Sequence, residues 1–472
     1  MSSSLRELAR CKVRFPGNCD TWRGIVSNLK LWGEVPEGFD VQRIGQISSV
    51  QTGPFGSQLH KEDYVDVGTP IVTVEHLGEN FFTHQNLPRV SEQDVERLSK
   101  YKLRAGDIVF SRVGSVERRS LVRNSEDGWL FSGRCLRIRP NPEVVCSTYL
   151  SYFLGHPGVR DYIRAIAVGA TMPSLNTKLL SDIPVYLPPL PEQRRVGELL
   201  GMLDEKIELN RQTARTLEEL TQRLFKSWFV DFDPVRAKMA GRKPAHTPPE
   251  IADLFPDRLV DSPLGPIPEG WRLANLREIV DLNPKEPLKK GVEALYVEMA
   301  ALPTAGMSIE GAFPREFKSG TRFRSGDTLM ARITPCLENG KGALFLHEHG
   351  ERPAWGSTEF IVLRPKDPVP ELWPYVLMRD SGFREYAIQN MTGTSGRQRV
   401  SAKSVGEYML PVPPSDVFRA FGDLVDGFAH RIERMRQESQ TLTQLRNRLL
   451  PKLISGEIRV PEAQELAKES VS

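Results

Sequence analysis

Basic residues gather in two stretches of the sequence, and arginine is well suited to binding phosphate and guanine. Residues 97–123 carry eight Lys or Arg residues against two acidic ones, and a second group lies in residues 315–332 and 397–403. A guanidinium group can pair in bidentate fashion with a phosphate or with guanine. One such cluster is usually a solvated face, but two at similar places in the chain favour a nucleic-acid partner.

Hydroxyl and amide residues lie among these basic residues and add hydrogen-bonding groups. Charge and position together give the candidate nucleic-acid contacts, which are Arg112, Arg118, Arg119, Thr171, Ser174, Asn176, Lys178, Arg332, Asn339, Lys341, Arg397, Arg399, Ser401 and Lys403.

Catalytic and metal-binding patterns are sparse. The sequence holds no Gly-x-Ser-x-Gly, no His-Glu-x-x-His and no phosphate-binding loop of the Walker type. Asp281, Glu316 and Lys318 match the residue types of many nuclease centres, and a stand-alone nuclease is therefore one alternative. The first half of the chain has no counterpart of these three residues, which weighs against it. The eight histidines lack ligand spacing, so no metal site is expected.

Composition narrows the class of protein further. The 472 residues suffice for two or three domains, and 39% hydrophobic with 26% charged residues is typical of a globular protein. The net charge of +3 means that any basic surface must be local. Five cysteines without a Cys-x-x-Cys pair, and no apolar run long enough for a signal peptide or a membrane span, predict a cytoplasmic protein.

The elements that must position these residues are repeated. Residues 188–228 recur 225 positions later without an insertion, at 413–453. The identical positions of the first copy are Pro188, Pro189, Arg194, Gly197, Leu199, Ile207, Glu208, Arg211, Gln212, Thr216, Leu217, Leu220, Arg223 and Leu224.

Both copies predict long helices. Mostly apolar residues follow alternating spacings of three and four from Leu200 to Trp228 and from Val425 to Leu453, which is a coiled-coil seam. A helix of roughly 40 residues would measure about 60 Å, longer than most globular helices. The alternative is two ordinary core helices. Pro451 replaces Lys226, so the second helix is expected to kink or stop near Leu450.

The repeat extends to the segments before each helix. Residues 104–112 match 324–332, and short apolar runs separated by turn residues predict a mixed α/β domain in each half. The expected order is an N-terminal extension (1–31), a first domain (32–187), a central helix (188–230), a proline-rich linker (231–266), a second domain (267–412), a C-terminal helix (413–455) and a polar tail (456–472).

Taken together, these features resemble one family, the DNA-specificity subunits of type I restriction-modification systems. The resemblance covers nearly all of the chain from Val35 to Val460. The segments that carry it are residues 53–57 (GPFGS), 187–193 (LPPLPEQ), 228–235 (WFVDFDPV), 333–341 (ITPCLENGK) and 394–401 (TSGRQRVS).

The resemblance implies an α+β protein with two mixed α/β target-recognition domains, each followed by a long helix. The helices would pair as an antiparallel coiled coil in a pseudo-two-fold arrangement. Each domain would read one half of a bipartite double-stranded DNA target, and the helices would dock two modification methyltransferase subunits, alongside restriction/translocase subunits if present. This chain would supply no catalytic group or cofactor, because S-adenosylmethionine, ATP and Mg would bind the partner subunits.

A coiled-coil scaffold for protein interactions, without DNA binding, is a further alternative. Its binding of partners would show no salt dependence.

Overall fold

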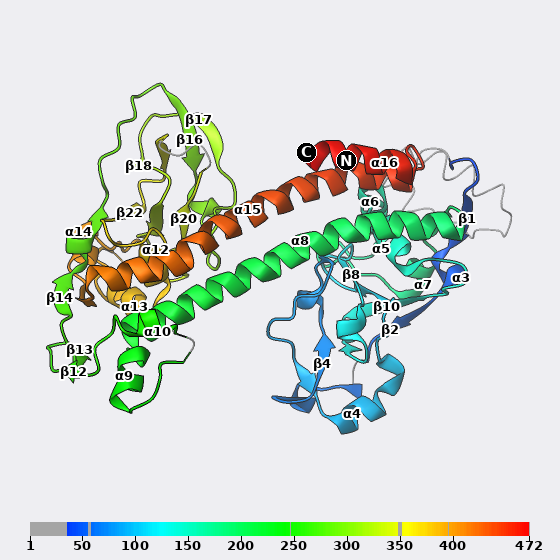
Figure 1. Cartoon of the computed structure of the whole chain (residues 1–472). Coiled ribbons are helices and arrows are strands. Elements are labelled where there is room, and N and C mark those ends of the chain that lie inside the picture. Colours follow the sequence, from blue (N-terminus) through cyan, green and yellow to red (C-terminus); the bar gives the residue numbers. More distant parts are fainter. Residues whose placement is uncertain (1–34, 55–57, 246, 348–351, 395, 472) are drawn as a thin grey trace. The chain divides into compact units, whose positions relative to one another are not determined.

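The chain folds into two compact units, each described here by itself. The computed structural model describes residues 35–54, 58–245, 247–347, 352–394 and 396–471 (Figure 1). Unit 1 comprises the residues up to 207 together with those from 440 onward, and unit 2 comprises residues 208–439. The predicted N-terminal extension at residues 1–31 and most of the turn at residues 53–57 lie outside the described residues.

Unit 1 is built on a five-stranded sheet in the order β2-β10-β7-β8-β5. The strands are β2 (Ser48–Thr52), β5 (Glu79–Asn80), β7 (Ile108–Ser111), β8 (Arg119–Leu121) and β10 (Cys135–Pro140). β7 is buried along its whole length, as its apolar sequence requires. Helices α5 (Ser147–Gly155) and α6 (Pro157–Ile166) complete the main core, and α5 packs on β8.

The smaller elements of unit 1 flank this sheet. β1 (Asp40–Arg43) pairs with β11 (Pro184–Leu187), close to α3 (Ile44–Ile47) and α7 (Thr177–Ser181). A second sheet has the order β3-β6-β4-β9 and covers a separate cluster of buried apolar residues. Its strands are β3 (Tyr64–Val65), β4 (Thr69–Val72), β6 (Arg89–Val90) and β9 (Leu130–Phe131), and the helix α4 (Glu92–Arg97) follows β6 in the chain.

Unit 2 repeats the main part of this plan. Its first sheet has the order β15-β22-β19-β20, and β14 (Arg272–Asn275) pairs with β23 (Met409–Val412) as β1 does with β11. The sheet strands are β15 (Val280–Leu282), β19 (Asp327–Ala331), β20 (Gly342–Phe345) and β22 (Phe360–Pro365). The helices are α11 (Leu276–Ile279), α12 (Trp373–Arg379), α13 (Ser381–Gln389) and α14 (Ala402–Gly406).

A second sheet of unit 2 has the order β17-β16-β21-β18. Its strands are β16 (Glu293–Val297), β17 (Phe313–Glu316), β18 (Thr321–Phe323) and β21 (Ala354–Gly356).

One buried ion pair recurs at the same place in both units. Arg139 of β10 donates two hydrogen bonds to Asp107 at 2.7 and 2.6 Å, and Arg364 of β22 binds Asp327 with two bonds of 2.6 Å. Both aspartates are 1% exposed. A buried carboxylate requires such a partner, so these matching residues of the two halves hold the sheet together.

The two long helices are α8 (Leu190–Phe225) and α15 (Ser415–Ile454), and the predicted α+β architecture is confirmed. Within unit 2, Asn210 of α8 donates to the carbonyl of Met435 at 3.4 Å, while Phe225 lies beside Phe421. The partners therefore run in opposite directions along the pair. Within unit 1, Asp204 of α8 binds Arg446 of α15 at 2.6 Å. The predicted seam residues are buried or half-buried on both helices.

The ends of the two helices differ from the sequence prediction. α15 continues through Pro451 to Ile454, so the expected stop near Leu450 is wrong. Leu449, Leu453 and Ile454 are buried in the core of unit 1, and this packing outweighs the missing proline hydrogen bond. At the matching place in the first copy, α8 gives way to a π-helical turn at Lys226–Val230.

The segments predicted as linker and tail contain short regular elements. Between the halves lie α9 (Asp233–Met239), α10 (Pro249–Ala252), β12 (Leu259–Val260) and β13 (Ile267–Pro268). The C-terminal segment forms α16 (Val460–Val471), whose Val460 and Ala463 are buried. Among the described residues, every helix is too short or too polar to cross a lipid bilayer.

Candidate nucleic-acid interface

In unit 1, the candidate residues cluster where β7 ends. Arg112 follows this strand, and its carbonyl accepts a hydrogen bond from Leu175 N at 2.9 Å. Ser174 forms antiparallel bridges with both Val113 and Val168. The loop of residues 168–176 is thereby fixed against the strand end, and Thr171 at its tip is exposed.

Unit 2 has the same arrangement at the end of β19. Val400 N donates to the carbonyl of Arg332 at 3.0 Å, and Arg399 forms bridges with both Ile333 and Thr392. Arg332 thus corresponds to Arg112, and Arg399 to Ser174. The backbone contacts therefore place one arginine of each half at the same position of the repeat, whereas the second position is a serine in unit 1 and an arginine in unit 2.

The side chains of unit 2 are arranged around a carboxylate that the sequence analysis did not single out. Arg399 donates to both oxygens of Glu359 at 2.7–3.0 Å, and Arg332 Nε lies 3.9 Å from the same carboxylate. The hydrogen bonds from Arg399 lower the pKa of Glu359. Arg332 Nε itself is buried without a hydrogen-bond partner. Glu359 therefore orients two guanidinium groups at the end of one strand.

The remaining candidates have different surroundings. Arg118, Lys178, Asn339, Arg397 and Lys403 are exposed, so their side chains are accessible to a ligand. Lys341 Nζ donates to the carbonyl of Met299 at 3.1 Å, and Ser174 Oγ donates to the carbonyl of Val168 at 3.1 Å.

Asn176 and Ser401 cap the N-termini of α7 and α14. Asn176 Oδ1 accepts from Leu179 N at 2.8 Å, and Ser401 Oγ accepts from Ser404 N at 2.9 Å. Their positions in the repeat are thereby explained by local structure.

Arg119 does not belong to this surface. It is 5% exposed, and its Nε donates to the carbonyl of Ser151 on α5 at 2.6 Å. In β8 it shares a face with Leu121, which is buried. All three residues of β8 are buried, so alternation along this strand gives no sequence signal that would place Arg119 inside.

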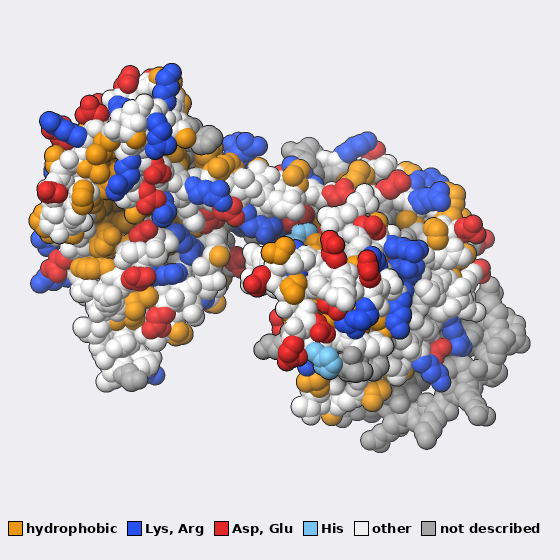
Figure 2. Space-filling model, turned by 90° about the horizontal axis from the view of Figure 1, so that it is seen from below, with side chains coloured by type: hydrophobic (Ala, Val, Ile, Leu, Met, Phe, Trp, Pro, Cys, Tyr) orange, Lys and Arg blue, Asp and Glu red, His pale blue; other side chains and the backbone are white. Residues whose placement is uncertain are grey.

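Other residues of the basic stretch 97–123 also serve the fold. Arg123 donates to the carbonyl of Asn80 at 2.9 Å and lies over the ring of Phe81, while Arg97 binds Asp94 at 2.6 Å. On the face seen in Figure 2, the Lys and Arg side chains of each unit stand among Asp and Glu side chains. The positive charge is local, as the modest net charge predicts.

A second group in unit 2 combines aromatic and basic side chains. Arg315 lies over the ring of Tyr296 at 4.6 Å, and the rings of Tyr296 and Trp355 are 4.3 Å apart. Phe313 beside them is 43% exposed. The residues come from β16, β17 and β21, which are separated in sequence, so no short motif announces the group.

The residues of the nuclease alternative lie on separate sheets. Asp281 is on β15 and binds Lys366 at 3.2 Å, whereas Glu316 is on β17 of the second sheet. Within the part of the chain that the structure describes, no group of three or more His, Cys, Asp or Glu residues is arranged to hold a metal ion.

Comparison with known proteins gives a consistent result. Residues 36–219 match the family model described as the Type I restriction modification DNA specificity domain. The HindI specificity subunit of Haemophilus influenzae is 23% identical over 427 residues, which are 80% of this chain and 92% of that protein. The MjaIX specificity subunit of Methanocaldococcus jannaschii is 22% identical over 448 residues, covering 91% and 96%.

A solved structure shows the same fold. The S subunit of the type I restriction-modification system from M. genitalium aligns with a TM-score of 0.56 and 16% sequence identity, over 88% of this chain and 96% of that chain. The resemblance inferred from the sequence is confirmed: residues 36–219 match the model of the DNA specificity domain, and relatives named as type I specificity subunits align over most of the chain.

Proposed function

We propose that the chain reads a bipartite double-stranded DNA target, with one half-site for each unit. The observation that carries this proposal is the repeated arrangement at the ends of β7 and β19. Each unit fixes an arginine and a loop with exposed polar or basic residues in the same backbone frame. The backbone of the strand end and its loop is arranged alike in the two units, while the side chains differ. This suits the recognition of two half-sites of different sequence.

The side chains that we assign to DNA are those that remain accessible or preoriented. In unit 1 these are Arg112, Arg118, Thr171 and Lys178. In unit 2 they are Arg332, Asn339, Arg397, Arg399 and Lys403. Exposed lysines suit phosphates, whereas a guanidinium held by a carboxylate, such as that of Arg399, is preorganised for base edges.

We further propose that the chain supplies no catalytic group and docks two copies of a modification methyltransferase subunit through the long helices. S-adenosylmethionine would then bind these partners, while ATP and Mg would bind restriction/translocase subunits where these exist. The relatives' names as specificity subunits of restriction enzymes support this division of labour.

Methylation mapping tests the proposal. The chain is expressed together with its modification subunit, and methylated adenines are mapped across the genome. We expect a split sequence motif with a fixed gap, and no such motif in cells that carry the modification subunit alone. A continuous motif, or methylation that does not depend on this chain, would exclude a bipartite reader.

The assignment of half-sites needs variants in each unit. Arg112→Ala is expected to weaken recognition of one half-site and Arg332→Ala that of the other, each by about 1–3 kcal/mol for a base contact. Loss of selectivity at the same half-site by both variants would contradict the assignment.

A further inference from the structure

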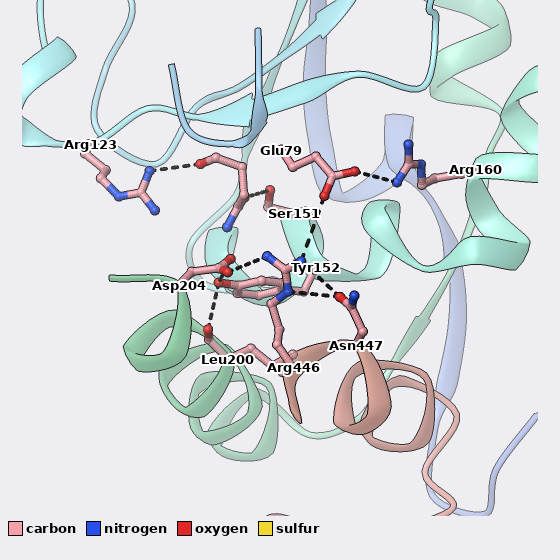
Figure 3. Close-up of polar contacts among 10 residues, drawn as sticks. Glu79, Arg123, Ser151, Tyr152, Arg160, Leu200, Asp204, Arg446 and Asn447 are labelled. Atoms are coloured by element: carbon pink, nitrogen blue, oxygen red, sulfur yellow. Dashed lines mark hydrogen bonds and ion pairs between the residues drawn. The ribbon is translucent and has the colours of Figure 1, made fainter. Parts of the chain in front are cut away.

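Unit 1 has a cleft of about 300 Å³ that none of the residues assigned to DNA lines. It lies where β5, β8, α5 and α6 of the domain meet α8 and α15 (Figure 3). Six of its lining residues bear on its chemistry, and they are Glu79, Asn80, Arg119, Arg160, Asp204 and Arg446.

The two carboxylates of the cleft are already paired. Asp204 is 2% exposed and accepts hydrogen bonds from Tyr152 Oη at 2.7 Å and from Arg446 Nη1 at 2.6 Å. Glu79 accepts a bond from Arg160 Nη1 at 2.8 Å, and its other oxygen is 3.9 Å from Arg446. Figure 3 shows these pairs as dashed lines between the labelled side chains.

Arg119 forms no salt bridge with either of these two carboxylates. Its guanidinium is buried, and its one hydrogen bond runs from Nε to the carbonyl of Ser151. Among the described residues, no carboxylate forms an ion pair with it. Burial lowers the pKa of Arg119 to about 10, which leaves it charged at neutral pH. The nearby charges of Glu79 and Asp204 favour the charged form of Arg119, but Arg160 and Arg446 bind the same two carboxylates. Three guanidinium groups therefore share two carboxylates, and a buried positive charge that is not fully balanced is costly.

Two further donors without partners belong to residues that line the cleft. Asn80 is 2% exposed, and its Oδ1 accepts from Ser151 Oγ, while Asn80 Nδ2 is buried with no hydrogen bond. Arg160 Nε is likewise buried and unpartnered. Nearly all buried polar groups in proteins are satisfied, so two orphan donors beside an unpaired guanidinium indicate a missing acceptor.

At the corresponding place in unit 2 the positive charge comes from another element, because Arg379 of α12 donates to Tyr375 Oη at 3.1 Å and to the carbonyl of Gly342 at 2.7 Å. Arg119 pairs across the sheet with Phe110, and Gly342 pairs with Met330, the residue that corresponds to Phe110. Gly342 is therefore the counterpart of Arg119. A Cβ on Gly155 would come within 1.9 Å of Arg119 Nη2, and a Cβ on Gly342 within 2.3 Å of the sulfur of Met378.

In unit 1 the large residue is on the strand and the glycine is on the helix. In unit 2 the glycine is on the strand and the large residue, Met378, is on the helix. Gly155 and Met378 each stand three residues after a tyrosine, Tyr152 or Tyr375, that donates to an acidic residue of α8. Unit 2 closes the space with the apolar side chain of Met378. Unit 1 instead places an arginine beside a glycine.

We propose that this cleft binds a phosphate-class oxoanion between Arg119 and Arg160, with Asn80 Nδ2 donating a third contact. A phosphate group supplies the negative charge that Arg119 lacks and the acceptor oxygens that the orphan donors lack. Inorganic phosphate and the phosphate of a nucleotide share this chemistry. Because the lining residues come from the domain and from both long helices, the bound anion ties the domain to the helix pair within unit 1.

The test is a titration of the full-length chain with sodium phosphate at constant ionic strength, followed by calorimetry and by thermal unfolding. Saturable binding of one phosphate per chain and a rise in the unfolding temperature are expected, while sodium chloride should produce neither. Arg160→Gln should weaken binding at least about tenfold, the loss of one strong charge-assisted contact. Arg164→Gln is the matched control, because Arg164 lies on the same helix and pairs with Asp161 and Glu117 outside the cleft.

A double substitution guards against a folding artefact. Arg119→Gly with Gly155→Met copies the packing of unit 2, so it should fold and yet bind no phosphate. AMP is titrated in parallel; tighter binding of AMP than of phosphate, with competition between them, identifies a nucleotide as the source. Absence of saturable binding by either ligand, or binding that survives the double substitution, overturns the proposal.

Discussion

Arg397 and Arg399 stand two positions apart in one loop, yet their surroundings differ. Arg397 is exposed, whereas Arg399 donates hydrogen bonds to both carboxylate oxygens of Glu359. An exposed guanidinium is free to meet a phosphate. We expect Arg397→Ala to weaken DNA binding similarly for all sequences and to reduce the slope of log affinity against log salt by about one.

The control for this measurement is Arg258→Ala, measured by fluorescence anisotropy of the complex over a salt series. Arg258 is also exposed but pairs with Glu269 outside the candidate interface. Equal salt slopes for wild type and Arg397→Ala would remove Arg397 from the interface. Arg399→Ala should cost more than Arg397→Ala, because it also leaves the charge of Glu359 facing the DNA.

Asp426 makes the stability of unit 2 depend on pH. Burial, and then the charge of Glu371, raise the pKa of Asp426 to about 6, and its Oδ1 is buried without a hydrogen bond. Its neighbours His430 and Asp423 act in opposite directions. Below pH 4 the carboxyl is protonated in both the folded and the unfolded chain. As the pH rises towards 6, the unfolded chain ionises first, so the folded state loses stability.

The substitution Asp426→Asn removes the loss of stability that ionisation of this buried carboxyl causes. We expect the free energy of unfolding to rise by about 1 kcal/mol at pH 7 to 8, a value reduced for the partial exposure of the group, and to change little at pH 4. Urea unfolding at the two pH values measures this change, with Asp253→Asn as the control, because Asp253 is an exposed aspartate of unit 2 that does not act on Asp426. A gain of the same size at pH 4 would contradict the assigned cause.

Sequence reasoning identified charged residues that match between the halves, but not the role of each. Arg139 and Arg364 match because each binds a buried aspartate, and the same residue type on the surface would look identical in the sequence. Asn176 and Ser401 match because they cap short helices. Glu359 was missed because its contact with Arg399 joins residues that are 40 positions apart. Partners distant in sequence decide whether an arginine is structural or available.

At the level of elements, both domains are joined to α8 by a buried tyrosine. Tyr152 donates to Asp204 within unit 1, and Tyr375 donates to Glu218 within unit 2. Asp204 also accepts from Arg446, and Glu218 also accepts from Gln222 Nε2 at 3.4 Å. Burial raises the pKa of Glu218 in spite of these contacts. Removing the tyrosine donor leaves an acidic group in a poorly solvated place.

We therefore expect Tyr375→Phe to lower the free energy of unfolding by about 1–3 kcal/mol, the cost of an unsatisfied buried group. Chemical denaturation followed by tryptophan fluorescence measures the change. Tyr64→Phe serves as control, because Tyr64 is 36% exposed. An equal loss of unfolding free energy in both variants would contradict a stabilising role for the hydrogen bond between Tyr375 and α8.

The long helices were the most predictable elements, because their seam alternates over many turns and the same pattern appears twice. Their ends were not predictable. Pro451 marks a break by propensity, but the buried side chains around it continue the helix. Leu220 and Leu445 are identical in the repeat, yet Leu220 is 49% exposed and Leu445 is 4% exposed. The same residue type is therefore buried in one helix and exposed in the other, because the surroundings of the two helices differ.

For the whole molecule, the proposed function makes the helix pair a spacer between two half-sites. Inserting four residues after Ala214 adds about 6 Å of helix, comparable to about two base-pair steps of 3.4 Å. Four residues make slightly more than one turn, so the apolar seam nearly keeps its face. We expect the gap in the methylated motif to lengthen while both half-sites stay the same.

Methylation mapping of the insertion variant measures the gap. A substitution that keeps the length, Ala214→Leu, is the control for disturbed packing. Altered half-sites with an unchanged gap would contradict the spacer role.

Unit 1 is discontinuous in the sequence, and this has a consequence for synthesis of the chain. Leu445, Leu449, Leu453 and Val460 belong to the core that also contains Tyr149 and Leu200. Residues up to 207 leave the ribosome long before residues 440–472, and unit 2 lies between them as one continuous segment. At 5–20 residues per second, the apolar face of unit 1 waits roughly 10 to 50 seconds for its last helix. Unit 2 can therefore fold first although it is made second, and nascent unit 1 is the part most in need of a chaperone.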